Sequence, residues 1–133
     1  MTRVADTSVL YALFSDADRF HERAVKDVGD PDPIVVPTEV LVETIDLLTY
    51  RFGFHAGRRA LEFLLELPHV GLAEKVEVAA VRAVYEAAKG RLSLADSFVV
   101  QTCLTLGTGA LAYDRQIVGE LRTRRPDPGH GTP

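Results

Sequence analysis

Short apolar runs alternate along the chain with longer segments whose apolar residues recur at helical spacing. The short runs have the length of strands rather than helices, and Pro, Gly or acidic residues follow them. Strands of this almost wholly apolar kind are typical of the inside of a parallel sheet. We therefore expect strands at residues 3–5, 34–36 and 109–112, and a weaker one at residues 70–72.

Helices are predicted between these strands. Thr7 or Ser8 caps the first, which runs through Phe14, and residues 15–18 end it and cap the second. Four further helices are expected from Thr38 through Phe52, over 55–67, over 77–88 and over 93–106. No last strand is assigned after Ile117, because residues 118–121 (VGEL) are a poor match to a strand. The alternation predicts an α/β fold, a three-layer α/β/α sandwich around a central, mostly parallel sheet of four to five short strands.

Two of these helices have a predicted inner face. In the helix that follows Pro37, one face carries Leu41, Ile45, Leu48 and Phe52, and the opposite face carries Glu39, Glu43 and Asp46. In the next helix Leu61, Leu64 and Leu65 are expected to point inward. One side of the first helix therefore packs, while its other side presents a row of carboxylates.

The helix over residues 93–106 is apolar or neutral on every side, which predicts that most of it is buried. Ser93 is a suitable N-cap and Gly107 a suitable stop. Its one charged residue is Asp96, in the first turn. One interpretation is a capping box, in which the carboxylate reaches back to the Ser93 N–H. The other is a metal-binding carboxylate at the edge of the core, kept ionised by the helix N-terminus.

Composition and charge narrow the class of protein. The chain has 133 residues, 47% of them hydrophobic, and a net charge of −4. We expect one domain over residues 1–122 and a disordered tail over 123–133. No apolar run is long enough to span a membrane, and the single cysteine, Cys103, suits a reducing cytoplasm. The charge gives no broad basic face for nucleic acid, although bound cations reverse the sign of an acidic pocket.

Four acids stand where the predicted sheet brings segments together. Asp6 and Asp114 directly follow strands, Glu43 lies early in the helix after another strand, and Asp96 is in a first helical turn. The carboxyl ends of parallel strands form one edge, where functional crevices lie. Carboxylates gathered there repel one another unless a cation binds or a proton is retained. Oxygen ligands of this kind select Mg²⁺ or Mn²⁺.

Four segments resemble, in order, the acidic motifs of PIN-domain nucleases. They are residues 4–10 (VADTSVL), 36–43 (VPTEVLVE), 92–97 (LSLADS) and 111–115 (LAYDR), and together they span nearly the whole domain. The length and layout look most like VapC-type toxins of toxin–antitoxin pairs. The resemblance implies a PIN-like fold and a Mg²⁺- or Mn²⁺-dependent endoribonuclease, the toxin of a type II module, which hydrolyses RNA phosphodiesters with metal-activated water.

The resemblance also implies the residues and partners of that activity. Asp6, Glu43, Asp96 and Asp114 are the implied catalytic residues and metal ligands. Arg115 and Thr7 are candidate substrate-binding residues. The implied partners are RNA, a cognate antitoxin that blocks the site and a second copy of the chain in a homodimer.

Other interpretations stay open. Asp6 is also placed to cap the next helix, and Asp114 to stand in a plain turn. PIN domains often carry Thr or Ser two residues before the fourth acid, where this chain has Ala112. The alternative function is therefore a catalytically weak PIN-fold module that binds RNA or protein.

A phosphotransferase of the haloacid-dehalogenase kind is a rival with Asp6 as nucleophile. That chemistry requires a second Asp where Ser8 stands, and a late lysine, but none follows Lys89. The missing lysine also counts against a phospho-receiver domain.

Overall fold

A computed structural model describes residues 1–73 and 75–124 of the chain. The elements in this part are, in order, β1 (Arg3–Ala5), α1 (Thr7–Phe14), α2 (His21–Gly29), β2 (Ile34–Val36), α3 (Thr38–Phe52), α4 (Phe54–Glu66), β3 (Val70–Leu72), α5 (Val78–Ala88), α6 (Leu94–Leu106), β4 (Gly109–Leu111) and α7 (Arg115–Arg124). The predicted strands and helices therefore form, with small shifts at their ends.

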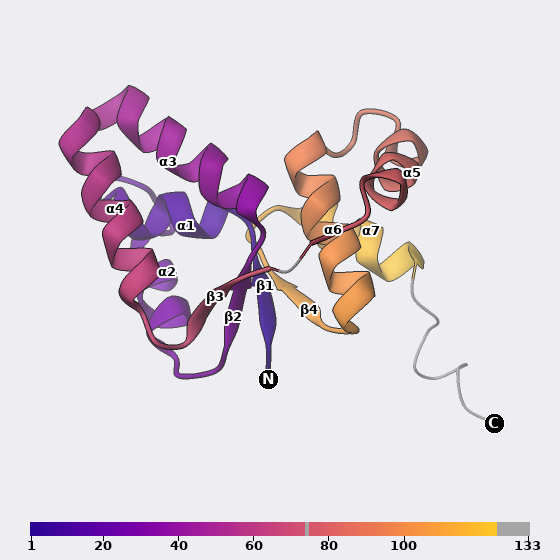
Figure 1. Cartoon of the computed structure of the whole chain (residues 1–133), viewed down its shortest axis with the longest axis horizontal. Coiled ribbons are helices and arrows are strands. Elements are labelled where there is room, and N and C mark those ends of the chain that lie inside the picture. Colours follow the sequence, from indigo (N-terminus) through magenta and orange to yellow (C-terminus); the bar gives the residue numbers. More distant parts are fainter. Residues whose placement is uncertain (74, 125–133) are drawn as a thin grey trace.

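The four strands make one parallel sheet in the order β3-β2-β1-β4. Helices lie on both of its sides: in Figure 1, α1 to α4 lie to the left of the strands and α5 to α7 to the right. The predicted three-layer α/β/α sandwich is confirmed. Because every strand runs the same way, the residues that follow β1, β2 and β4 emerge at one edge of the sheet.

Helix α6 packs against the centre of this sheet. Val99, Val100 and Cys103 are fully buried, as the apolar pattern predicts. Ser93 is its N-cap, and Gly107 ends it in the left-handed conformation, with φ 66°. Even so, no helix among residues 1–73 and 75–124 is long and apolar enough to cross a membrane.

The first helix has the cap that was predicted as the alternative, and the second has no side-chain cap from residues 15–18. Asp6, rather than Thr7 or Ser8, caps α1, because its carboxylate accepts the Ser8 N–H. The N-cap of α2 is Phe20, which makes no side-chain capping bond. The Asp18 carboxylate accepts the Phe20 N–H rather than an N–H of the helix. Asp6 therefore satisfies a helix end as well as following a strand.

Two residues predicted to face inward are exposed. Phe52 ends α3 beyond the cover of its neighbours and is 51% exposed, and Leu65 on α4 is 57% exposed. The buried stripe of α4 runs instead through Gly57, Ala60 and Leu64. A side chain at Gly57 would collide with Thr49 of α3, so close approach of the two helices sets which face of α4 turns inward.

Helix α7 is the element that the pattern did not predict. It buries Ile117 and Leu121 on one side and extends through Arg124. The expected boundary after residue 122 therefore falls inside this helix. The rest of the expected disordered tail, residues 125–133, lies outside the described residues.

Candidate active site

Asp6 stands at the carboxyl edge of the sheet, directly after the central strand β1. Its backbone N–H donates to the Leu111 carbonyl at the end of β4, at 3.0 Å. Its Oδ2 accepts from the Ser8 N–H (3.2 Å) and the Ser8 hydroxyl (2.7 Å). The residue is only 3% exposed, and within the described part of the chain its buried Oδ1 has no hydrogen-bond partner.

Asp96 brings a second carboxyl to Asp6 from the first turn of α6. The Ser93 hydroxyl accepts the Asp96 N–H at 3.0 Å, and hydrogen bonds from Ser93 hold the Asp96 carboxylate, as in the capping-box interpretation. The same carboxyl also contacts Asp6. Burial, the Asp6 charge and the hydrogen bond to Asp6 together raise the pKa of Asp96 to about 6. Capping and a place in the site are therefore compatible for Asp96.

Burial makes two full charges on this pair of carboxyls costly. Burial raises the pKa of Asp6 too, while hydrogen bonds from Ser8, the Thr7 backbone and Asp96 oppose that rise. Where the pair holds one proton, Asp96 carries it, because the Ser8 hydrogen bonds stabilise the charge on Asp6. With a pKa of about 6, Asp96 keeps its proton in mildly acidic solution and ionises near neutral pH, where two charges then lie close together at the edge of the core.

Glu43 faces a groove beside this pair. It is half-buried on α3 and lines an open groove of about 570 Å³ between α3 and the start of α6. The other lining residues are Glu39, Val42, Asp46, Leu47, Tyr50, Leu94, Ala95 and Phe98. Leu94 and Ala95 directly precede Asp96, so the groove opens next to the carboxyl pair without including it. The predicted row of carboxylates is thus mixed with apolar side chains.

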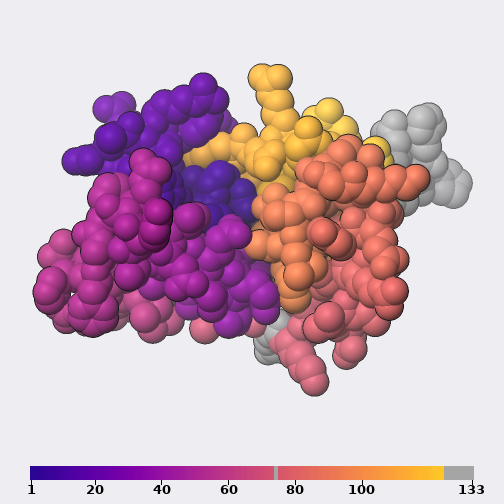
Figure 2. Space-filling model, turned by 90° about the horizontal axis from the view of Figure 1, so that it is seen from above, coloured from indigo at the N-terminus to yellow at the C-terminus, as the bar shows by residue number. Residues whose placement is uncertain are grey.

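Asp114 lies on the opposite side, at the start of α7. Its Oδ1 accepts the Gln116 N–H at 2.8 Å, which is the turn interpretation. The preceding residue, Tyr113, donates its N–H to the Ser8 hydroxyl at 3.2 Å. Ser8 therefore joins the Asp114 loop to Asp6. Figure 2 looks down on this edge, where the indigo N-terminal segment lies between the purple of α3 and the yellow of α7.

The structure brings two of the four predicted acids into contact and leaves two beside them. Within residues 1–73 and 75–124, no three His, Cys, Asp or Glu side chains form a group able to hold a metal ion. Asp6 and Asp96 form a pair, whereas Glu43 lines the groove and Asp114 is bonded within its own turn. A buried Asp6 carboxylate in contact with the Asp96 carboxyl, which ionises near neutral pH, is an arrangement that a hard divalent cation fits.

The predicted substrate contacts have different surroundings. Thr7 is 8% exposed, and in the described residues its buried hydroxyl has no partner. Arg115 is exposed at the first position of α7. Between Asp114 and the sheet, Tyr113 packs against Phe20, and burial and Asp27 raise the pKa of its hydroxyl, which stays a donor.

Ser8 is the site residue that the sequence did not single out beyond a possible cap. Its hydroxyl donates to Asp6 and accepts from Tyr113. A hydroxyl two residues after an acid, at a strand-to-helix junction, is the signal that would have identified it.

A parallel sheet covered on both faces, with a buried carboxylate pair at its carboxyl edge, defines a class of α/β domain with an acidic site. The chain belongs to the PIN domain family, whose model matches residues 3–118. Among solved structures it is similar to the crystal structure of Mycobacterium tuberculosis VapC20, described as a sarcin–ricin loop cleaving toxin. The two share 23% sequence identity over 90% of this chain and 94% of that one, with a TM-score of 0.74. No curated protein matches the sequence significantly.

Proposed function

We propose that this protein is a divalent-metal-dependent endoribonuclease and the toxin of a type II toxin–antitoxin module. The observation that carries the proposal is the pair of contacting carboxyls, the buried Asp6 and the half-buried Asp96, at the carboxyl edge of the sheet. Membership of the PIN domain family supports it. So does the fold shared with VapC20, a toxin described as cleaving the sarcin–ricin loop.

The proposed roles follow from the position of each residue. Asp6 and Asp96 would hold Mg²⁺ or Mn²⁺ through their carboxylate oxygens. Glu43 and Asp114, on the two sides of the pair, are the proposed further ligands. When bound, the metal supplies an activated water and stabilises charge as water adds across one P–O bond of the RNA.

The remaining residues position and bind. Ser8 fixes the orientation of Asp6 through its 2.7 Å hydrogen bond. Arg115 and Thr7 are proposed to contact RNA, Arg115 because it is an exposed cation directly after Asp114. The proposal includes a cognate antitoxin that covers the site, a homodimer and a cytoplasmic location.

Cleavage of a sarcin–ricin loop hairpin tests the proposal. We expect cutting with Mn²⁺ or Mg²⁺ and none with EDTA. Asp96→Asn keeps the shape of the side chain but removes its charge, and it should lower the cleavage rate by roughly 10²-fold or more. Glu86→Gln, on the exposed face of α5, is the matched control and should cut normally. Cutting in EDTA, or normal cutting by Asp96→Asn, would contradict the proposal.

A catalytically weak module that binds RNA or protein is the second candidate. Two observations favour it: Ala112 stands where the family often has a hydroxyl, and in the described residues only two of the acids are in contact. The same hairpin separates the candidates. A binding module would retain the RNA in Mn²⁺ without cutting it.

A further inference from the structure

Two arginines and two aromatic rings are stacked where α2 meets the Asp114 loop. The rings of Phe20 and Tyr113 lie with centroids 4.8 Å apart. The Arg19 guanidinium covers the Phe20 ring at 4.5 Å, and the Arg23 guanidinium covers the Tyr113 ring at 4.6 Å. We call these four residues, Arg19, Phe20, Arg23 and Tyr113, the arginine–aromatic ladder.

Hydrogen bonds fix the positions of the two residues that carry the rings of the ladder. The Tyr113 hydroxyl donates to Oδ2 of Asp27 at 2.8 Å, and the Phe20 N–H donates to Asp18 at 2.8 Å. Arg3 of β1 donates to the Asp27 carbonyl at 3.2 Å, which ties this part of α2 to the sheet. The rings are therefore a fixed platform, and the guanidiniums that rest on them are ordered before any partner arrives.

The guanidiniums keep hydrogen-bond donors available. Arg19 and Arg23 are both exposed, and no carboxylate among residues 1–73 and 75–124 forms an ion pair with Arg19. Arg23 lies 3.7 Å from Asp27, a long contact to an oxygen that already accepts from Tyr113. A stacked guanidinium is covered on one face, while the N–H groups in its plane remain free for phosphate oxygens.

The ladder is connected to the candidate site through a single side chain. The Tyr113 N–H donates to the Ser8 hydroxyl at 3.2 Å, which in turn donates to Asp6 at 2.7 Å. Tyr113 also directly precedes Asp114. An RNA strand bound at Asp6 would therefore lie close to the ladder.

We propose that the ladder binds the sugar–phosphate backbone of the RNA on its way into the site, with the guanidiniums of Arg19 and Arg23 on successive phosphates. This proposal rests on the proposed function, because its ligand is the RNA strand that the protein is proposed to cut. The net charge of −4 gives the protein no general attraction for RNA. Ordered arginines beside the site supply that attraction locally.

The double variant Arg19→Ala/Arg23→Ala tests the proposal, with Arg58→Ala/Arg82→Ala as the matched control. The control also removes two exposed arginines, but these are paired along their own helices with Glu62 and Glu86. In hairpin cleavage we expect KM to rise about tenfold for the ladder variant, with kcat within about twofold, and no change for the control.

Binding without cleavage gives a second measurement. We follow a labelled RNA hairpin by fluorescence anisotropy in EDTA over a range of salt concentrations. The association constant K falls as salt rises, so the slope of log K against log salt is negative. Loss of two phosphate contacts should make this slope shallower by about 1.5. Arg19→Lys/Arg23→Lys keeps the charge but lacks the planar stacked group, and it should restore only part of the affinity.

The outcomes separate this proposal from the proposed function. If the wild type cuts RNA and the ladder variant has the same KM and salt slope, the ladder proposal is wrong and the nuclease proposal stands. If the wild type binds the hairpin through the ladder but never cuts it, the nuclease proposal fails alone. If a polyglutamate peptide competes as well as RNA does, the ladder is a general anion surface, and RNA is not its specific partner.

Discussion

Asp6 meets two demands with its two carboxylate oxygens. Oδ2 caps α1 and accepts from Ser8, while Oδ1 is buried without a partner in the described residues. A plain helix cap does not require this burial, or a second carboxyl in contact with it. The buried Oδ1, which the cap does not use, and the contact with the raised-pKa carboxyl of Asp96 are the residue-scale features that distinguish a site from a cap.

Asp96 should make the metal-free protein less stable as pH rises. The folded pKa is about 6, against an ordinary value of 3.8. Folding therefore favours the protonated form, and the stability that this contributes is lost as pH rises through the folded pKa. As pH rises from about 4 to about 7, we expect the free energy of unfolding of Asp96→Asn to increase relative to that of the wild type by about 1 kcal/mol. This value allows for the solvent screening of a half-buried group. Urea unfolding in EDTA measures the difference.

Glu86→Gln, at an exposed position, is the control for general effects of removing a charge. Its difference from the wild type should be nearly the same at each pH. A difference between Asp96→Asn and the wild type that does not change with pH would show that Asp96 is ionised in the folded protein.

The sequence predicts part of the site because part of it depends on position along elements. Asp6 after a strand and Asp96 in a first turn necessarily reach the carboxyl edge. Glu43 and Asp114 lie near it too, but their orientation depends on the rotation of α3 and on the turn before α7. Tertiary packing sets both, and no local pattern records them. Ser8 lies two residues after Asp6, which a local pattern does record, but its second contact, with Tyr113, spans 105 residues and is not recorded locally.

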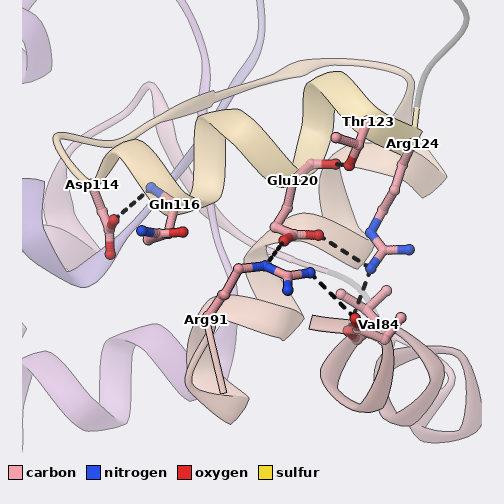
Figure 3. A network of polar contacts seen from close by, with 8 residues as sticks. Val84, Arg91, Asp114, Gln116, Glu120, Thr123 and Arg124 are labelled. Atoms are coloured by element: carbon pink, nitrogen blue, oxygen red, sulfur yellow. Dashed lines mark hydrogen bonds and ion pairs between the residues drawn. The ribbon is translucent and has the colours of Figure 1, made fainter. Parts of the chain in front are cut away.

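At the scale of elements, the sequence predicts the helices that have one apolar face, and it predicts α6, which is apolar or neutral on every side. It does not predict α7. Gly119 and a run of charged residues obscure its periodicity. Its inward face includes Glu120, a carboxylate that a hydrophobic pattern assigns to solvent. The structure resolves this by pairing Glu120 with Arg91 at 2.7 Å and with Arg124 at 3.3 Å (Figure 3). These contacts join α7 to the loop before α6.

Glu120→Ala should destabilise the protein far more than Glu86→Ala. The two ion pairs have nearly equal lengths, 2.7 Å to Arg91 and 2.8 Å to Arg82, but the Glu120 side chain is 9% exposed and that of Glu86 is 60% exposed. Removing Glu120 leaves a partly buried Arg124 without its carboxylate, which we expect to cost about 2 kcal/mol. Removing Glu86 should cost under about 0.5 kcal/mol. Equal urea unfolding midpoints for Glu120→Ala and Glu86→Ala would show that burial does not make the Glu120 ion pairs more stabilising.

At the scale of the whole molecule, topology explains why distant segments share one edge. All four strands are parallel, so β1, β2 and β4 each deliver the next residues to the same side. The alternation of apolar runs predicts this arrangement, because parallel strands need helical crossovers. The strand order is not contained in that pattern. It follows from packing, which places β1 in the sheet interior with Asp6 at the centre of the edge.

Such an edge concentrates acid in a folded chain that already carries a net charge of −4, so a cation bound there should stabilise the whole fold. A ligand that binds only the folded state adds RT ln(1 + [L]/Kd), about 2.7 kcal/mol at a hundredfold excess over Kd. We therefore expect Mn²⁺ to raise the melting temperature by roughly 10 °C over EDTA. Differential scanning calorimetry measures this without RNA. The double variant Asp6→Asn/Asp96→Asn should lose the shift, whereas Asp30→Asn, on an exposed loop, should keep it. An equal shift in all three proteins would place the cation elsewhere.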